Sequence, residues 1–233
     1  MSENPLDNPI WHALAGEQAR FALSGGAARR FRADIGPLAA VRDQSDDGLA
    51  DLAALARKHG ALVLFQPDDD SRMPNRHAGL RVVKQARGVQ MIFREAVSFR
   101  ETDDAQARPL GPENYPEMLA LARLTEPGPF AARTADLGGF WGIFDDGRLI
   151  AMAGQRLRIP GHAEVSGVCT HPDARGRGLA ARLTRKVVGQ ILAEGRLPIL
   201  HAYADNEVAL ALYRRLGFAE RTHFRLTACE AAP

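Results

Sequence analysis

The stretch Val165-Ser-Gly-Val-Cys-Thr-His-Pro-Asp-Ala-Arg-Gly-Arg-Gly-Leu-Ala180 is the most informative part of the chain. It reads as a strand that runs into a glycine-rich loop, and the loop opens a basic helix. Gly176 and Gly178 have no Cβ atom, so successive backbone N–H groups can converge there. The helix beginning near Gly178 adds unpaired N–H donors and the positive end of its dipole, and Arg175 and Arg177 add charge. The pattern predicts a binding site for an anion such as a diphosphate.

The charge distribution points to the same segment. The formal net charge is only +2, too close to neutral for attraction of nucleic acid by the whole surface. Between Asp173 and Lys186, however, there are five cations and one anion. The five cations are Arg175, Arg177, Arg182, Arg185 and Lys186. We therefore expect an anionic ligand at this segment and not at the surface in general.

Several other interpretations of the glycine loop remain. Gly176-Arg-Gly-Leu-Ala-Ala181 formally fits the dinucleotide fingerprint G-x-G-x-x-A, but there the first glycine ends the strand, and here residues 171–175 intervene. A P-loop needs Gly-Lys-Ser/Thr, and single-stranded nucleic acid needs stacking aromatic residues near the cations; the segment has neither. A purely structural loop with solvated arginines also stays open on these residues alone.

Composition indicates a globular protein. The 233 residues are 45% hydrophobic and 25% charged, and the length allows one large domain or two modest ones. The longest clean apolar run is Ala61–Phe65, whereas a membrane span needs roughly 18 residues. The first residues do not resemble a secretion signal, and two cysteines, Cys169 and Cys229, cannot form a disulfide framework. We expect a soluble protein of the reducing cytoplasm.

The first part of the chain reads as a mixed α/β unit with no recognisable chemistry. Asn8 followed by Pro9 is typical of a helix start, and leucines at helical spacing predict a helix over Asp46–His59. Ala61–Phe65 and Val89–Phe93 read as strands, whereas the polar segment Glu101–Arg108 reads as a linker. We therefore divide the chain into two domains, residues 1–106 and 107–233.

In the second part of the chain, glycine and proline residues mark the ends of the predicted helices and strands more clearly. The predicted helices cover 113–124, 179–195 and 206–216, and the predicted strands cover 141–144, 149–157, 163–170, 198–204 and 223–227. A helix, a glycine and an apolar strand occur as Leu55–Phe65 and again as Leu192–Tyr203. This echo indicates either an old duplication, with the first domain a degenerate copy of the second, or merely a common α/β unit.

Two motifs carry a family resemblance. Arg175-Gly-Arg-Gly-Leu-Ala180 resembles the coenzyme A loop of the GNAT superfamily of N-acetyltransferases. Downstream, Ala204-Asp-Asn-Glu-Val-Ala-Leu-Ala-Leu-Tyr-Arg-Arg-Leu-Gly-Phe218 resembles the closing signature of the same superfamily. The resemblance covers about residues 107–233 and looks most like a bacterial branch with an N-terminal extension. Residues 1–106 match no motif with functional content.

The resemblance implies an α/β (α+β) fold with a mixed, mostly antiparallel sheet flanked by helices and splayed where acetyl-CoA enters. It implies transfer of an acetyl group from acetyl-CoA, as cosubstrate and without a metal, to a primary amine of a small molecule or peptide. Neither nucleic acid nor a membrane is an expected partner, and the acceptor and oligomeric state stay open. The alternatives are a non-catalytic acyl-CoA-binding interaction module and a transferase that uses a different acyl-CoA.

The resemblance also implies roles for individual residues. Val168, Cys169 and Thr170 would present backbone groups to the pantetheine arm, and the side chain of Cys169 is expected in the core. The pyrophosphate would be held by the loop residues Arg175, Gly176, Arg177, Gly178, Leu179 and Ala180.

Three further residues complete the expected site. Tyr213 would offer its hydroxyl to the departing thiolate, and Asn206, seven residues earlier and so on nearly the same helix face, would contact the cofactor. Glu164 is the expected base, because an amine is mostly protonated at neutral pH and must lose a proton. Each has a structural alternative: a core tyrosine, a helix N-cap and an exposed strand carboxylate.

Residues 1–106 lack a counterpart of this site. Asp43, Asp46 and Asp47 precede the helix that contains Leu49, and three carboxylates would repel a diphosphate there. We therefore expect one coenzyme per chain.

Overall fold

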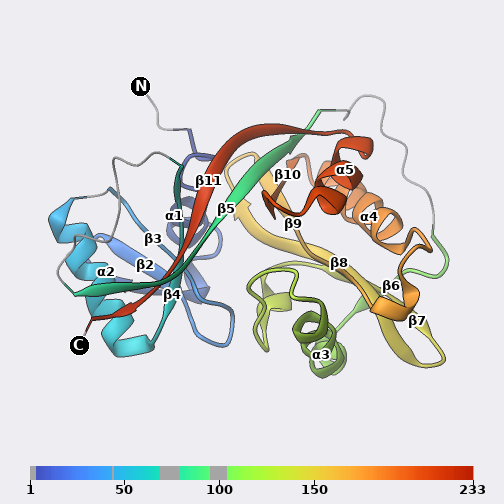
Figure 1. Ribbon diagram of the computed structural model, residues 1–233, viewed down its shortest axis with the longest axis horizontal. Helices are drawn as coiled ribbons and strands as arrows, with labels where there is room; N and C mark the ends of the chain where they lie inside the picture. Colours follow the sequence, from blue (N-terminus) through green and yellow to red (C-terminus); the bar gives the residue numbers. More distant parts are fainter. Residues whose placement is uncertain (1–3, 44, 69–78, 95–103, 233) are drawn as a thin grey trace.

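The computed structural model describes residues 4–43, 45–68, 79–94 and 104–232. Its centre is one mixed sheet of eleven strands, in the order β1-β2-β3-β4-β11-β5-β10-β9-β8-β7-β6. Helices flank this sheet, as the family resemblance implies (Figure 1). The predicted fold class is confirmed.

The first half of the chain forms one end of the sheet. Its helices are α1 (Pro9–Ala15) and α2 (Asp46–His59), and its strands are β1 (Ala22–Gly25), β2 (Ala28–Phe31), β3 (Leu38–Val41), β4 (Leu62–Pro67) and β5 (Leu80–Phe93). The predicted span of α2 is confirmed; Ser45 caps it by accepting a hydrogen bond from the N–H of Gly48, and Gly60 ends it at φ 84°.

The second half forms the other end. Its helices are α3 (Tyr115–Thr125), α4 (Leu179–Ala193) and α5 (Glu207–Arg215), and its strands are β6 (Arg108–Leu110), β7 (Phe140–Asp145), β8 (Arg148–Ile159), β9 (His162–Thr170), β10 (Leu197–Tyr203) and β11 (Phe218–Ala231). Short 3-10 turns cover 19–21, 112–114, 134–137 and 172–174. The predicted helices and strands of this half all occur; β11 is much longer than predicted, and the ends of the others shift by one or two residues.

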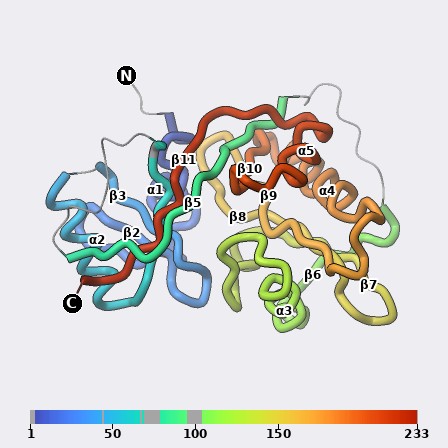
Figure 2. The backbone as a smooth tube through the Cα atoms, in the orientation of Figure 1, coloured from blue at the N-terminus to red at the C-terminus, as the bar shows by residue number. Residues whose placement is uncertain are grey.

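The two halves exchange their last strands. β5 lies between β10 and β11, and β11 lies between β4 and β5, in each case with antiparallel pairing. Figures 1 and 2 show these two long strands side by side across the middle of the molecule. The sheet is therefore continuous across the division that we predicted at residue 106, and that division stays a prediction.

The order of elements repeats about the β5–β11 pair. β3 and β4 are parallel and joined through α2, just as β9 and β10 are parallel and joined through α4. The two segments of the sequence echo fall at equivalent places, α2–β4 and α4–β10. This topology supports the interpretation that the first half is a copy of the second.

Apolar side chains from both halves share one core cluster. Ile10 and Phe31 of the first half pack with Leu157, Ile159 and Ile199 of the second, and all five are nearly inaccessible. A second cluster lies beneath α4, whose buried face includes Leu183 and Val187. Burial shared in this way holds the two halves together.

Two features of the sheet differ from the prediction. The short strands β1, β2 and β3 were not predicted, and β5 and β11 are each 14 residues long, much longer than their predicted apolar cores.

No helix in the described part of the chain is both long and apolar enough to span a membrane.

Candidate active site

Two adjacent parallel strands separate at the centre of the second half. The pairing of β9 with β10 ends at Val165 and Leu200, so the backbone beyond these residues has no partner across the gap. Gly167 and Val168 together face the single residue Ala153 of β8, which makes a β-bulge. Gly167 has φ 62°, and a Cβ atom there would lie 2.7 Å from the Phe140 ring. The bulge therefore requires glycine at this position.

The predicted anion loop follows directly on β9. Gly176 and Gly178 both have positive φ, 79° and 72°, and no atom lies within 4 Å of a Cβ built at either position. Gly178 is the N-cap of α4 and makes no side-chain cap hydrogen bond, so the N–H groups at residues 179–181 have no acceptor within the helix, and the first turn contains no acidic residue. Open space, backbone donors and a helix N-terminus coincide here, and these features fit a diphosphate.

The cations of this segment divide into two groups. Arg182 is bound to Asp104 at 2.5 Å, and the exposed Arg177 pairs with Asp145 at 2.9 Å. Arg175 is exposed and forms no ion pair within the described ranges. Of the two arginines in the loop, Arg175 is therefore the one whose charge is not paired with a carboxylate among the described residues.

The other residues predicted to line the coenzyme path lie at the end of β9 and at the start of α5. Cys169 is buried, and burial raises the pKa of its thiol to about 12, so it stays a protonated core thiol. Thr170 ends β9, and its Oγ1 is buried without a hydrogen bond from any described residue. Asn206 caps α5 by accepting a hydrogen bond from the N–H of Ala209 at 3.1 Å. Its side-chain amide nitrogen has no hydrogen-bond partner among the described residues.

A small cavity of about 50 Å³ lies where β9 and β10 separate, and we call it the reaction cavity. Its lining includes Tyr213, whose side chain is 9% exposed and whose pKa burial raises to about 12, so the hydroxyl keeps its proton at neutral pH. The cavity is also lined by Phe65, Pro127–Pro129, Arg156, Val165–Val168, His201–Tyr203, Phe224 and Leu226. Residues of both halves therefore surround it.

Glu164 is not an exposed strand carboxylate. Its side chain is fully buried and receives two hydrogen bonds from Arg156, at 2.9 and 2.6 Å, while the Nδ1 of His201 lies 2.8 Å from Oε1. Burial alone would raise the pKa of Glu164, but the charge of Arg156 and the pairing with His201 outweigh it and hold the pKa at about 2. The carboxylate is ionised, occupied on both oxygens and absent from the cavity lining.

A polar chain that was not predicted as a site continues from Glu164 to the surface. The Nε2 of His201 lies 3.0 Å from the amide nitrogen of Gln90, whose oxygen accepts a hydrogen bond from Arg221 at 2.9 Å. Arg221 in turn binds Asp7. These residues come from β10, β5, β11 and the N-terminal segment, so no local sequence pattern could have grouped them.

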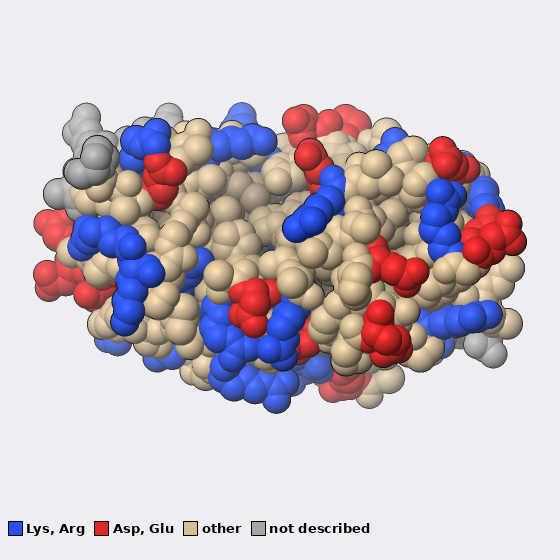
Figure 3. Space-filling view, turned by 90° about the horizontal axis from the view of Figure 1, so that it is seen from below, with Lys and Arg blue, Asp and Glu red and all other residues tan. Residues whose placement is uncertain are grey.

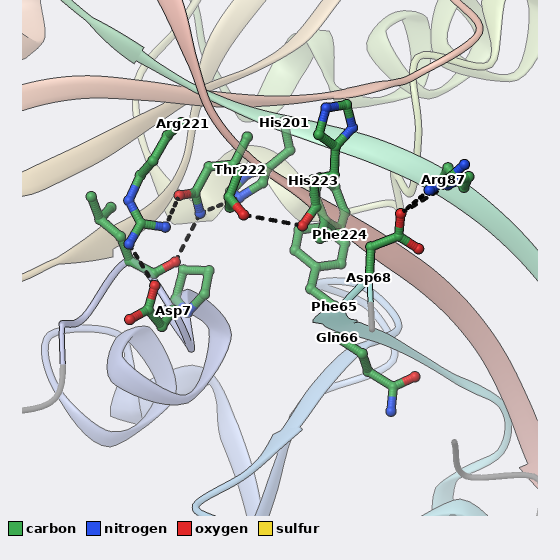
Figure 4. Close-up of a pocket in the computed structure, with 13 residues that line it drawn as sticks. Asp7, Phe65, Gln66, Asp68, Arg87, His201, Arg221, Thr222, His223 and Phe224 are labelled. Atoms are coloured by element: carbon green, nitrogen blue, oxygen red, sulfur yellow. Dashed lines mark hydrogen bonds and ion pairs between the residues drawn. The ribbon is translucent and has the colours of Figure 1, made fainter. Parts of the chain in front are cut away.

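This chain runs along a second cavity of about 630 Å³, the side pocket, shown in Figure 4. Its wall toward the reaction cavity consists of three packed rings, Phe65, His201 and Phe224, with centroids 4.7 to 5.2 Å apart. The same three residues line the reaction cavity. His201 is therefore a buried polar ring in the wall between the two spaces.

A larger cleft of about 1060 Å³, the outer cleft, adjoins the reaction cavity on another side, and both share Gly128, Pro129 and Tyr203. Charged side chains of both signs stand around it: Lys84, Arg87, Arg123, Glu126 and Asp205. Figure 3 shows the molecule hollowed near the centre of one face, with charged side chains of both signs around the hollow. The described residues contain no group of three His, Cys, Asp or Glu side chains placed to hold a metal ion.

Comparison with known proteins agrees with this geometry. The model of the family FR47-like protein matches residues 140–226. A solved structure from Novosphingobium aromaticivorans, assigned to the GNAT family of acetyltransferases, is 41% identical, with a TM-score of 0.89 over 99% of this chain and 100% of that one.

Curated relatives agree as well. The mycothiol acetyltransferase of Mycobacterium sp. (strain JLS) is 31% identical over 195 residues, 73% of this chain and 63% of the relative, so this chain spans less than two thirds of its length. The N-alpha-acetyltransferase RimI of Mycobacterium tuberculosis is 32% identical over 117 residues, 46% of this chain and 73% of the relative. With its splayed strands, its glycine loop and these relatives, the chain belongs to the GNAT family of acetyltransferases.

Proposed function

We propose that the protein transfers an acetyl group from acetyl-CoA to a primary amine. The observation that carries the proposal is the meeting of three features at one place: the splayed β9–β10 pair, the glycine loop at the start of α4, and the hydroxyl of Tyr213 in the cavity between them. Together they offer backbone partners to an extended thiol arm, donors to a diphosphate and a proton to a leaving sulfur. When bound, acetyl-CoA supplies the activated acetyl group.

The predicted coenzyme residues are assigned to segments of that path. Val168, Cys169 and Thr170 would hold the pantetheine arm through their backbone, because β10 does not pair with them. The pyrophosphate would lie on Arg175–Ala180, and the free amide nitrogen of Asn206 would contact the coenzyme from α5. Each assignment rests on unpaired donors or acceptors at the stated positions.

Tyr213 is proposed as the proton donor to the thiolate. Its hydroxyl forms no hydrogen bond within the described ranges, and its raised pKa keeps it protonated at neutral pH. It can therefore give a hydrogen bond, and then its proton, to the sulfur as the carbon–sulfur bond breaks, and positioned proton transfer contributes roughly 10²–10⁴-fold to a rate.

Glu164 was predicted as the base that deprotonates the amine. A carboxylate with a pKa of about 2 and both oxygens occupied is a weak base, because general bases work best with a pKa near the operating pH. We therefore propose that Glu164 acts indirectly, by holding Arg156 and His201 in place at the wall of the reaction cavity.

The acceptor is proposed to approach through the outer cleft. That cleft opens onto the reaction cavity, and Glu126 at its rim offers a carboxylate for an ammonium group. The relatives differ in kind, since one is named for mycothiol and the other for N-alpha-acetylation. Small-molecule amines and peptide N-termini are therefore both candidate acceptors.

An acceptor screen tests the proposal. Purified protein is given acetyl-CoA with amino acids, amino sugars, polyamines or short peptides, and release of the free thiol is followed; the matched control is Gly178→Glu, which places a negative charge at the diphosphate site. We expect thiol release that depends on one acceptor class and is lost in the variant. Tight coenzyme A binding with no release from any amine would instead support the alternative of a non-catalytic acyl-CoA-binding module.

A further inference from the structure

We propose that the acceptor is an α-amino acid and that Arg156 binds its carboxylate while its amine reaches the acetyl group. The inference rests on the proposed acetyl transfer and names the substrate class for the same cavity. It makes Arg156 of β8 the residue that determines acceptor specificity, although this residue belongs to neither of the two sequence motifs.

The guanidinium of Arg156 has one edge occupied and one edge free. Its Nε and Nη2 bind the two oxygens of Glu164 at 2.9 and 2.6 Å, which uses the first edge. The second edge consists of Nη1 and the remaining N–H of Nη2, and it forms no hydrogen bond with any residue that the structure describes. Each edge of an arginine presents two parallel N–H groups that match the two oxygens of a carboxylate. Arg156 can therefore hold a second carboxylate beside Glu164.

The free edge belongs to a buried side chain that a ligand can still reach. The side chain of Arg156 is only 7% exposed, yet the residue lines the reaction cavity together with Tyr213. The part of the cavity wall that comes from β4 and β11 is apolar, with Phe65, Phe224 and Leu226. Buried N–H donors in folded proteins are almost always hydrogen-bonded. A partner for the free edge therefore has to enter the cavity.

The free edge lies on the side of the sheet from which the acceptor is proposed to approach. Ala163 and Val165 of β9 pack beneath α4, so Glu164 between them projects from the opposite face, where it meets Arg156. Figure 1 shows α4 on one side of β8 and β9 and α3 on the other. The segment after α3, Pro127–Pro129, lines the reaction cavity and in part the outer cleft. An acceptor that enters from the outer cleft therefore meets Arg156 across the sheet from the diphosphate site.

Size and charge both favour a small zwitterion. The cavity of about 50 Å³ has room for a few water molecules, and a carboxylate and an amine joined by one carbon atom need a space of that order. The amino acid side chain would extend into the outer cleft, where charges of both signs are present. The pair of Arg156 and Glu164 has no net charge, and a zwitterion adds none. A buried site of this kind suits a zwitterion better than a polycation such as a polyamine.

The product class follows from this binding mode. The amine nitrogen forms its bond to the acetyl carbon as the carbon–sulfur bond breaks. Of the two protons that the ammonium group loses, one goes to solvent and the other ends on the coenzyme thiol by way of Tyr213, which is reprotonated. The product is an N-acetyl amino acid, whose carboxylate stays on Arg156 until it leaves.

A matched substrate series tests the inference on the wild-type protein. Acetyl-CoA is supplied with L-amino acids that have cationic, anionic or neutral side chains, with the amide of each, and with the amine that lacks the carboxyl group. The kcat/KM is calculated for the unprotonated amine, so that differences in amine pKa do not enter. We expect the preferred amino acid to exceed its amide roughly 10²-fold and the decarboxylated amine roughly 10⁴-fold, because a site that hydrogen-bonds a group rejects analogues lacking it. Equal values for acid and amide, or turnover only with peptides, polyamines or amino sugars, would overturn the inference and leave acetyl transfer intact.

Two variants test whether the carboxylate lies on Arg156. Arg156→Lys keeps a cation beside Glu164 but has no second edge, so the preference for acid over amide should fall roughly tenfold or more. Arg156→Met combined with Glu164→Leu removes both charges of the buried pair together, which leaves no bare charge in the core, and should abolish the preference with coenzyme A affinity unchanged. Arg158→Lys, two residues along β8 in an ion pair with Glu194, is the matched control and should keep the preference. A preference that survives in the double variant would refute the role of Arg156.

Binding measurements separate this inference from the proposed function. If no amine supports turnover, the proposed function fails, and calorimetric titration of the coenzyme A complex with the same amino acids and amides still tests the carboxylate site. We expect an amino acid to bind at least roughly tenfold more tightly than its amide, and this difference to vanish in the double variant. Equal binding of acid and amide to the wild-type complex would refute the inference.

Discussion

Replacement of Glu164 by glutamine should destabilise the protein strongly, although it exchanges only one heavy atom. Glu164 is fully buried and Arg156 is 7% exposed, so the variant leaves a buried guanidinium without its counter-charge. Removing one partner of a buried ion pair costs about 3–5 kcal/mol. The amide retains part of the hydrogen bonding, so we expect the lower end, about 3 kcal/mol.

The same ion pair also makes the stability depend on pH. The pKa of Glu164 falls from 4.5 to about 2 on folding, and at about 1.4 kcal/mol per pKa unit this contributes about 3 kcal/mol. Because the folded pKa is depressed, the contribution is complete above about pH 5, declines as the pH falls, and is gone near pH 2. The stability difference between wild type and variant should shrink over that window.

Urea unfolding followed by tryptophan fluorescence measures this, since Trp11 and Trp141 report on both halves. The matched control is Asp145→Asn, the same chemical change in an ion pair whose members are about half exposed, where we expect less than about 1 kcal/mol. A loss below about 1 kcal/mol in Glu164→Gln at pH 7, or a difference that does not change between pH 5 and pH 3, would refute the reasoning.

Three further predictions concern the coenzyme site. Gly178→Glu should abolish coenzyme A binding in calorimetric titration. Gly178→Ala has the same backbone strain at φ 72° but adds no charge, so it should retain binding. Equal affinities of the two variants would show that the diphosphate does not lie on this loop. Tyr213→Phe should lower kcat roughly 10²–10⁴-fold with little change in coenzyme A affinity, and an unchanged rate in a single-turnover experiment would leave the tyrosine a packing role only. Titration of the intact chain should give one coenzyme per chain, since the start of α2 has two carboxylates in its first turn, and a stoichiometry near two would reveal a second site.

Local chemistry explains what could be predicted from the sequence. The spans of α2 and α4 follow from helical spacing and glycine stops, and the loop from Arg175 to Ala180 follows from glycines beside cations. The lengths of β5 and β11 could not be predicted, because exposed residues at 81, 83–85 and 87 of β5 and at 220, 222 and 223 of β11 interrupt the apolar pattern. The partners of Glu164 were equally invisible, since His201 is 37 residues away and Gln90 joins from the other half.

The exchange of β5 and β11 between the halves imposes an order on folding. Synthesis completes β5 at residue 93, but its two neighbours, β10 and β11, lie more than one hundred residues later. Until they are made, β5 has two unpaired edges, and β4 lacks its neighbour β11 as well. Closing contacts over such separations is slow, and unpaired edges promote aggregation. We therefore expect the first half to remain incomplete on the ribosome and the sheet to close only after the last strand has emerged.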